Sequence, residues 1–150
     1  MTVSINISRD EVMDAVSMRS AQLGAKTQTA DNDAYRRVFA ADADRELLDQ
    51  YWKEACSTAT TALKRWMGSS NTGADSWAVT LYASASYDAS LNQGVKDSLQ
   101  SFLVLDILSK WLRMTLPDQS AASAAEATAM LADANTKLHY RKKPVRNTNE

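Results

Sequence analysis

Few side chains in this sequence have the chemistry to react. It contains one cysteine, Cys56, and one histidine, His139. Cys56 lies four residues after Trp52 in an apolar stripe, and no histidine or basic cluster is near it in the sequence to lower its pKa. His139 follows Leu138 near the end of a predicted helix, among cations. We therefore interpret Cys56 as a small buried hydrophobe and His139 as a solvent-exposed helix residue, and neither as catalytic.

Carboxylates are more numerous, but they occupy positions typical of helix ends. Two groups, within 10–14 and 42–46, fall in the first turns of predicted helices, where negative charge complements the helix dipole. One histidine and one cysteine leave only an all-carboxylate metal site, and the four glycines form no phosphate-binding loop. The sequence therefore predicts that the protein is not an enzyme and has no cofactor or metal. An enzyme that uses carboxylates alone is the least favoured alternative.

The composition is that of an ordinary globular protein. Its 150 residues, 45% of them hydrophobic, suffice for one domain with a buried core, and the net charge of −1 points to neither nucleic acid nor a membrane. The single cysteine excludes a disulfide scaffold. The first residues lack the basic and apolar regions of a signal peptide, and the longest apolar run, 102–105, is too short to span a bilayer. We expect a soluble protein made in a reducing cytoplasm, without a membrane partner.

Charge is unevenly distributed along the chain. Residues 137–150 contain five basic residues and one acidic residue, whereas residues 1–136 contain 12 basic and 17 acidic residues. Because Pro144 prevents a helix there, we divide the chain into a helical domain at 1–140 and an extended basic tail at 141–150. We expect the tail to dock onto an acidic neighbour through four cations and one apolar anchor: Arg141, Lys142, Lys143, Arg146 and Val145. The alternative is a solubilising tail without a partner.

Hydrophobic patterning predicts a mostly helical α+β fold, a helical bundle with a small β element. Alternating apolar residues predict a strand at 2–7. Ser8 and Glu11 form a capping box for a helix that should end at Gly24. A polar loop at 25–34 should follow, and then a short apolar turn that contains Tyr35, Val38 and Phe39.

The strongest periodic signal lies in the middle of the chain. Apolar residues at spacings of three and four predict a long helix from Asp42 or Asp44 to Met67, followed by a polar loop at 68–73. Alternation then predicts a strand or hairpin at about 76–87, either straight or bent near Ala83. Because two strands alone make a weak sheet, the N-terminal strand should pair with this one, or another chain should complete an edge.

Two further helices are expected. One starts at Asp88 or Ser90, ends near Met114 and changes its apolar face along its length, so that it must pack against two different surfaces. Asp118 should cap the last helix, which is rich in alanine and ends near Tyr140.

Two residues outside the tail are candidate partner contacts. Tyr82 lies on the polar side of its predicted strand, and tyrosine is enriched at protein interfaces. Asp106 interrupts an apolar run. For Asp106 we expect an exposed ion pair with Lys110, and the alternative is a contact between subunits.

The order of these helices and strands resembles that of a known protein family. A long helix at 44–55, reading DRELLDQYWKEA, is followed by the strand at 77–87 and by a helix that contains FLVLDILSKWL at 102–112. An alanine-rich helix then ends in LHYRKKP at 138–144. Over most of residues 35–144, this pattern resembles the head–tail connector (adaptor ring) proteins of tailed bacteriophages, as in phages of gut Bacteroides, including crAss-like phages.

The resemblance implies a structural virion protein without catalytic residues. Such a protein forms a homo-oligomeric ring, usually of about twelve subunits, between the portal and the tail of a particle assembled in the cytoplasm of a bacterial host. DNA would pass through the lumen without specific binding, and an acidic body suits such a channel. The alternative function is a small helical regulatory or chaperone-like protein-binding module that acts as a monomer or dimer. A measurement of size separates the two.

Overall fold

The computed structural model describes residues 1–27 and 44–146. The fold is α+β and mostly helical, as the sequence predicts. The described elements, in chain order, are β1 (Thr2–Ser8), α1 (Arg9–Thr27), α3 (Arg45–Ala62), β2 (Met67–Thr72), β3 (Ser76–Tyr82), the short 3-10 helix η2 (Ala89–Leu91), α4 (Asn92–Leu112) and α5 (Pro117–His139). Residues 28–34 of the loop predicted at 25–34, the predicted apolar turn with Tyr35, Val38 and Phe39, and the Asp42 cap lie outside the described residues.

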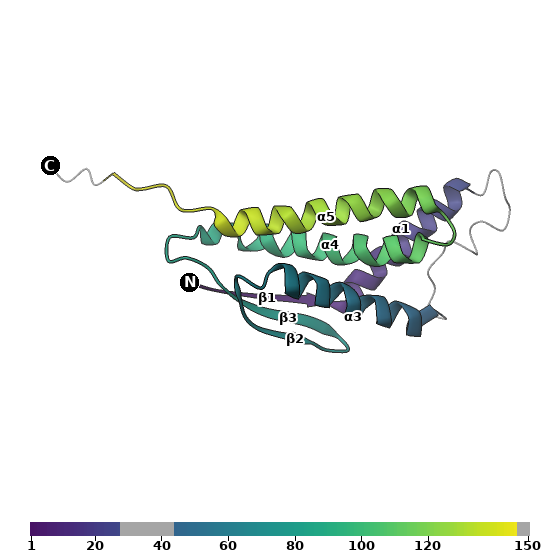
Figure 1. Cartoon of the computed structure of the whole chain (residues 1–150), viewed down its shortest axis with the longest axis horizontal. Coiled ribbons are helices and arrows are strands. Elements are labelled where there is room, and N and C mark those ends of the chain that lie inside the picture. Colours follow the sequence, from purple (N-terminus) through teal and green to yellow (C-terminus); the bar gives the residue numbers. More distant parts are fainter. Residues whose placement is uncertain (28–43, 147–150) are drawn as a thin grey trace.

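Helix α4 is the central element of the molecule. Figure 1 shows α5 alongside α4 on one side, with α3 and the strands on the other side, and α1 crossing α4. Residues 102–105 of α4 are all buried. Four consecutive residues point in directions that span most of the circumference of a helix, so cover on one side alone cannot bury them all. The predicted packing of this helix against two surfaces is therefore confirmed.

The strands form an antiparallel sheet in the order β1-β3-β2. Ile5 pairs with Val79 at the centre of β1 and β3, and the pairing extends to Met1, which donates to and accepts from Ala83 at 2.9 and 2.8 Å. Alternate residues of the two strands are buried beneath the helices: Val3, Ile5, Ile7, Trp77, Val79 and Leu81. The predicted N-terminal strand at 2–7 is thus confirmed, and it pairs with β3 of the same chain.

Strand β2 corrects the predicted end of the long helix. Helix α3 ends at Ala62 and not at Met67, and the residues predicted as a loop pair with β3. Because β2 is polar and almost wholly exposed, its sequence contains no apolar alternation, and backbone hydrogen bonds to β3 hold it in place. The Tyr82 ring lies against Gly68, where a Cβ atom would overlap the ring. The glycine therefore makes room for the exposed tyrosine.

Two other elements end at residues that differ from the prediction. The strand predicted at about 76–87, straight or bent near Ala83, ends at Tyr82, and residues 83–87 do not continue it. Strand β3 forms a hairpin with β2. Helix α1 does not end at Gly24 but continues to Thr27. A glycine inside a helix costs only about 1 kcal/mol relative to alanine, a cost that tertiary packing readily offsets.

The last helix begins earlier than predicted. Pro117 occupies the first turn of α5 and Leu116 its N-cap, so Asp118 is not the capping residue. Proline suits the first turn because the N–H group that it lacks would have no partner within the helix. Asp118 lies in that turn, where its negative charge complements the helix dipole.

We predict that Leu108→Ala lowers the free energy of unfolding by about 2–5 kcal/mol, because truncation of a fully buried leucine leaves a cavity in the packing around α4. Leu108 is 2% exposed. The control is Met114→Ala, since Met114 is 90% exposed and loses little buried surface. Denaturant unfolding of both variants measures the difference. Equal stability of the two variants would show that the Leu108 face is open to solvent.

Candidate functional site

The cysteine and the histidine lie apart, and each has a structural environment. Cys56 is fully buried in α3, and burial raises the pKa of its thiol to about 12. His139 is exposed, as predicted, but its ring packs edge-on against Trp66 with 4.8 Å between the ring centroids. Among the residues that the structure describes, no group of three His, Cys, Asp or Glu is placed to hold a metal ion. Nor is any helix in those residues both long and apolar enough to cross a bilayer.

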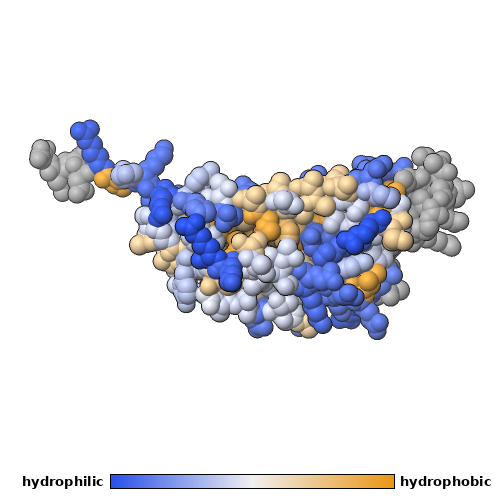
Figure 2. All heavy atoms as spheres, viewed as in Figure 1, coloured by the Kyte–Doolittle hydropathy of each residue, from blue (hydrophilic) through white to orange (hydrophobic). Residues whose placement is uncertain are grey.

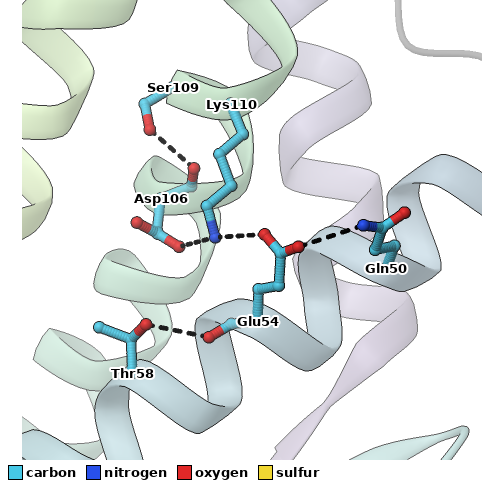
Figure 3. Close-up of polar contacts among 6 residues, drawn as sticks. All are labelled: Gln50, Glu54, Thr58, Asp106, Ser109 and Lys110. Carbon is cyan, nitrogen blue, oxygen red and sulfur yellow. Dashed lines mark hydrogen bonds and ion pairs between the residues drawn. The ribbon is translucent and has the colours of Figure 1, made fainter.

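Asp106 belongs to a charged cluster that joins α4 to α3 (Figure 3). Lys110 Nζ lies 3.1 Å from Asp106 Oδ2 and 3.1 Å from Glu54 Oε2. The predicted pair of Asp106 with Lys110 is confirmed, but it is not exposed, because the two side chains are only 20% and 16% accessible. Hydrogen bonds from Lys110 and Gln50 lower the pKa of Glu54. Asp106 therefore takes part in a contact between two helices of the same chain.

A second charged cluster joins α4 to α5. Lys137 Nζ lies 2.7 Å from Asp133 Oδ2 and donates to Ser98 Oγ at 3.0 Å and to the Gly94 carbonyl at 3.3 Å. Ser98 Oγ in turn donates to Asp133 Oδ2 at 2.6 Å. The hydrogen bonds from Lys137 and Ser98 lower the pKa of Asp133. This cluster, like the first, fixes one helix against another.

Exposed apolar side chains gather at the end of the molecule where β3 and α5 finish. Tyr82, the predicted interface residue, is 61% exposed, and Tyr140 is 54% exposed. Met1 and Val145 are also exposed, and backbone pairing places Met1 beside Ala83 at the same end. This end therefore holds four of the seven large apolar side chains that are exposed in the described part of the chain.

The base of the tail is anchored at this end. Residues 140–142 pair with residues 86–88, and within this pairing the Lys142 N–H donates to the Ser86 carbonyl at 2.8 Å. The Arg141 guanidinium donates to Ser86 Oγ at 2.8 Å. Two of the predicted docking residues, Arg141 and Lys142, are thus part of the contact between the tail and its own chain.

Beyond its base the tail projects from the body. Residues 143–146 are exposed and make no hydrogen bond or ion pair with the described part of the chain. Figure 1 shows this segment extending past the end of α5, and Figure 2 shows it as mostly hydrophilic. Among the predicted docking residues of the tail, Lys143, Val145 and Arg146 are therefore the ones that project from the body.

Two grooves lie at the start of α3. One, of about 580 Å³, runs between α1 and α3 and is lined by Arg9, Asp10, Met13, Asp14, Ser17, Arg45 and Leu48. A shallower hollow of about 510 Å³ surrounds residues 44–50. Sequence reasoning missed the groove between α1 and α3, since no periodic spacing links residues 9–17 to residues 45–48.

Comparison of the chain with protein-family models, curated proteins and solved structures finds no match. Function is therefore inferred from the geometry and the sequence alone.

We predict that the protein loses stability as the pH falls below the ordinary carboxyl range. Folding lowers the pKa values of Glu54 and Asp133, so in acid the unfolded chain binds more protons than the folded chain. Their contribution is complete above the ordinary values of 4.5 and 3.8 and disappears as the pH falls through the lowered ones. Glu54→Gln should flatten this dependence in thermal melts at a series of acidic pH values. An unchanged pH profile in that variant would contradict the role of the Lys110 cluster.

Cys56 should resist alkylation in the folded protein. The thiolate is the reactive form, and a pKa of about 12 makes it scarce. Burial also keeps the reagent away from the sulfur. Mass spectrometry after iodoacetamide treatment should find no adduct in native buffer and one adduct per chain in denaturant. A Val145→Cys variant is the control, because Val145 is 89% exposed and the new thiol should react without denaturant. Equally rapid labelling of Cys56 would show that the helix packing opens readily.

Proposed function

We propose that this protein is a structural subunit of a homo-oligomeric ring, a head–tail connector (adaptor) of a tailed bacteriophage particle. The observation that carries the proposal is the tail, which is anchored through backbone hydrogen bonds at its base and projects from a helical body. A fixed base directs the projecting residues and reduces the conformational entropy that they lose on docking. Such an arm is suited to contact with a neighbouring subunit.

The distribution of charge supports the same proposal. The body, residues 1–136, has five more acidic than basic residues, whereas the arm is basic. An arm and the body of another copy therefore attract each other. An acidic ring would also let DNA pass through its lumen without binding it. The portal and the neighbouring connector or tail proteins, which the resemblance implies, would be the other partners in the virion.

The polar groups of the described residues fit a structural role better than catalysis. The clusters around Lys110 and Lys137 each hold two helices together. Cys56 is buried, and its raised pKa keeps the thiol protonated. These groups stabilise the body that carries the arm.

A regulatory or chaperone-like protein-binding module is the alternative, and the exposed Tyr82 and Tyr140 favour it. Aromatic residues of this kind are common in interfaces with other proteins. Such a module would remain near the monomer mass of 16.5 kDa or twice that value. A closed ring of about ten or more subunits would have a correspondingly larger mass. Light scattering with and without portal protein distinguishes them.

Removal of residues 143–150 should weaken assembly while the fold stays intact. The truncated chain keeps Lys142, whose N–H anchors the tail base at Ser86, and loses the projecting residues 143–146 together with residues 147–150. We expect light scattering to show smaller assemblies, and the thermal melt of the monomer to match that of the full-length chain.

The control replaces residues 143–150 by a Gly/Ser segment of equal length, which preserves the length of the arm but not its charge. This variant should behave like the truncated chain. Full-size assemblies from the truncated chain would show that the arm has no part in assembly.

A further inference from the structure

The two ends of the molecule carry opposite charge. At one end, the arm presents Lys143 and Arg146 with Val145 between them. Figure 1 shows the start of α3 at the end away from the arm. There, the described residues at the start of α3 and in the first half of α1 contribute six carboxylates and two guanidinium groups: Asp10, Glu11, Asp14, Asp44, Glu46, Asp49, Arg9 and Arg45. One of the guanidinium groups, Arg9, is itself paired with Asp49 and Asp10. The charge left at this end is negative and complements the arm.

The groove between α1 and α3 offers the arm apolar side chains beside carboxylates. Its volume is about 580 Å³. Met13 and Leu48 supply an apolar floor, and Asp10 and Asp14 supply an acidic rim. Two guanidinium groups, Arg9 and Arg45, also line the groove, and Arg9 is paired with Asp10 and Asp49. Both rim residues are exposed, and the Asp10 side chain is 84% accessible. An apolar residue flanked by cations, which is the pattern of the arm, fits a floor of this kind beside carboxylates.

The arm of the same chain cannot reach this groove. Helix α3 has 18 residues and is therefore about 27 Å long. It runs from the groove at Arg45 toward the arm's end of the molecule, where Trp66 donates to Asn135 Oδ1 at 3.0 Å. From the anchored Lys142 to Val145 the chain spans at most about 11 Å. An arm in the groove must therefore belong to another copy.

We infer that the groove between α1 and α3 receives residues 143–146 of a second copy of this chain. The inference rests on the proposed function, because it names the contact through which the copies assemble. The valine of the arm packs on the apolar floor, and the flanking cations meet the acidic rim. Burial of the valine supplies affinity, and the charges orient the approach.

This contact joins two different surfaces, one from each end of the molecule. A contact of that type is heterologous: repetition closes into a ring when the rotation between copies allows it, and otherwise extends as a filament. Each copy then offers one arm and one groove, so that every arm in a closed ring is occupied.

Charge exchange tests the contact in the full-length chain. Lys143→Glu with Arg146→Glu reverses the arm, and Asp10→Lys with Asp14→Lys reverses the rim. Either pair alone should weaken self-association about tenfold at low salt, as measured by light scattering, because it turns two attractions into repulsions. All four substitutions in one chain should restore association. Added salt should reduce the differences, since exposed charges are screened over about 8–10 Å.

The matched control for the arm is Lys53→Glu with Lys64→Glu, which makes the same change in net charge at two exposed lysines outside the arm. This control should associate like the wild type. A thermal melt of each variant shows that it is folded.

An engineered disulfide tests the geometry independently. Val145→Cys with Met13→Cys should give a ladder of linked chains on a non-reducing gel, because bridged cysteines need Cα atoms within about 7 Å. Cys56 is buried and does not compete. The control pair, Val145→Cys with Met114→Cys, places the second thiol at a site that is 90% exposed and outside the groove, and it should give no ladder.

The inference is supported if both charge-reversed pairs associate more weakly, the combined variant recovers association, and only the cysteine at position 13 gives a ladder. Wild-type assembly that resists both reversals and gives no ladder would overturn the inference and leave the proposed function standing. A wild-type chain that stays monomeric, with and without portal protein, would overturn the proposed function itself.

Discussion

Burial on all sides of α4 is the constraint on which the other elements depend. Residues 102–105 are buried around the helix, so α5 must cover one side while α1, α3 and β1 cover the other. Small buried residues on α5, Ala127 and Ala134, leave room for α4 to approach. Two lysines at the borders of these contacts, Lys110 and Lys137, are neutralised by carboxylates from their own and neighbouring helices. Hydrophobic burial thus sets the arrangement, and the charged clusters fix the helices within it.

The same constraint decides which surfaces remain for a partner. The buried apolar residues and the clusters around Lys110 and Lys137 are used in contacts between elements of the same chain. Both ends also keep exposed groups. One end has the projecting arm and the exposed Tyr82, and the other has the groove between α1 and α3. The two ends thus present different groups, a basic arm and a groove with carboxylates at its rim.

The sequence predicts the helices and strands in which burial of one face produces a repeating pattern of apolar residues. The sequence predicts β1 and β3 because one face of each is buried, so that apolar residues alternate along the strand. It does not predict β2, because β2 is almost wholly exposed and shows no such alternation. Trp66 and Met67 continue the apolar spacing of three and four in the sequence although they lie outside α3. The predicted helix therefore extends past the observed end at Ala62. The exposed arm was predicted from composition. Glu54 joins the Asp106 cluster only because α3 packs on α4, and the groove forms only where α1 meets α3. Neither feature can be recognised in the sequence of one helix alone.

The anchoring of the arm also has a mechanical consequence. Its base pairs through backbone groups with residues 86–88, a few residues after Ala83, which in turn pairs with Met1 at the start of β1. Tension applied to the arm is therefore transmitted along the chain into the β1–β3 ladder, where hydrogen bonds lie across the strands. Because the arm also continues directly from α5, a pull on it is shared between the end of α5 and the hydrogen bonds to residues 86–88. The backbone pairing at the base of the arm thus couples the arm to the sheet as well as to the end of α5.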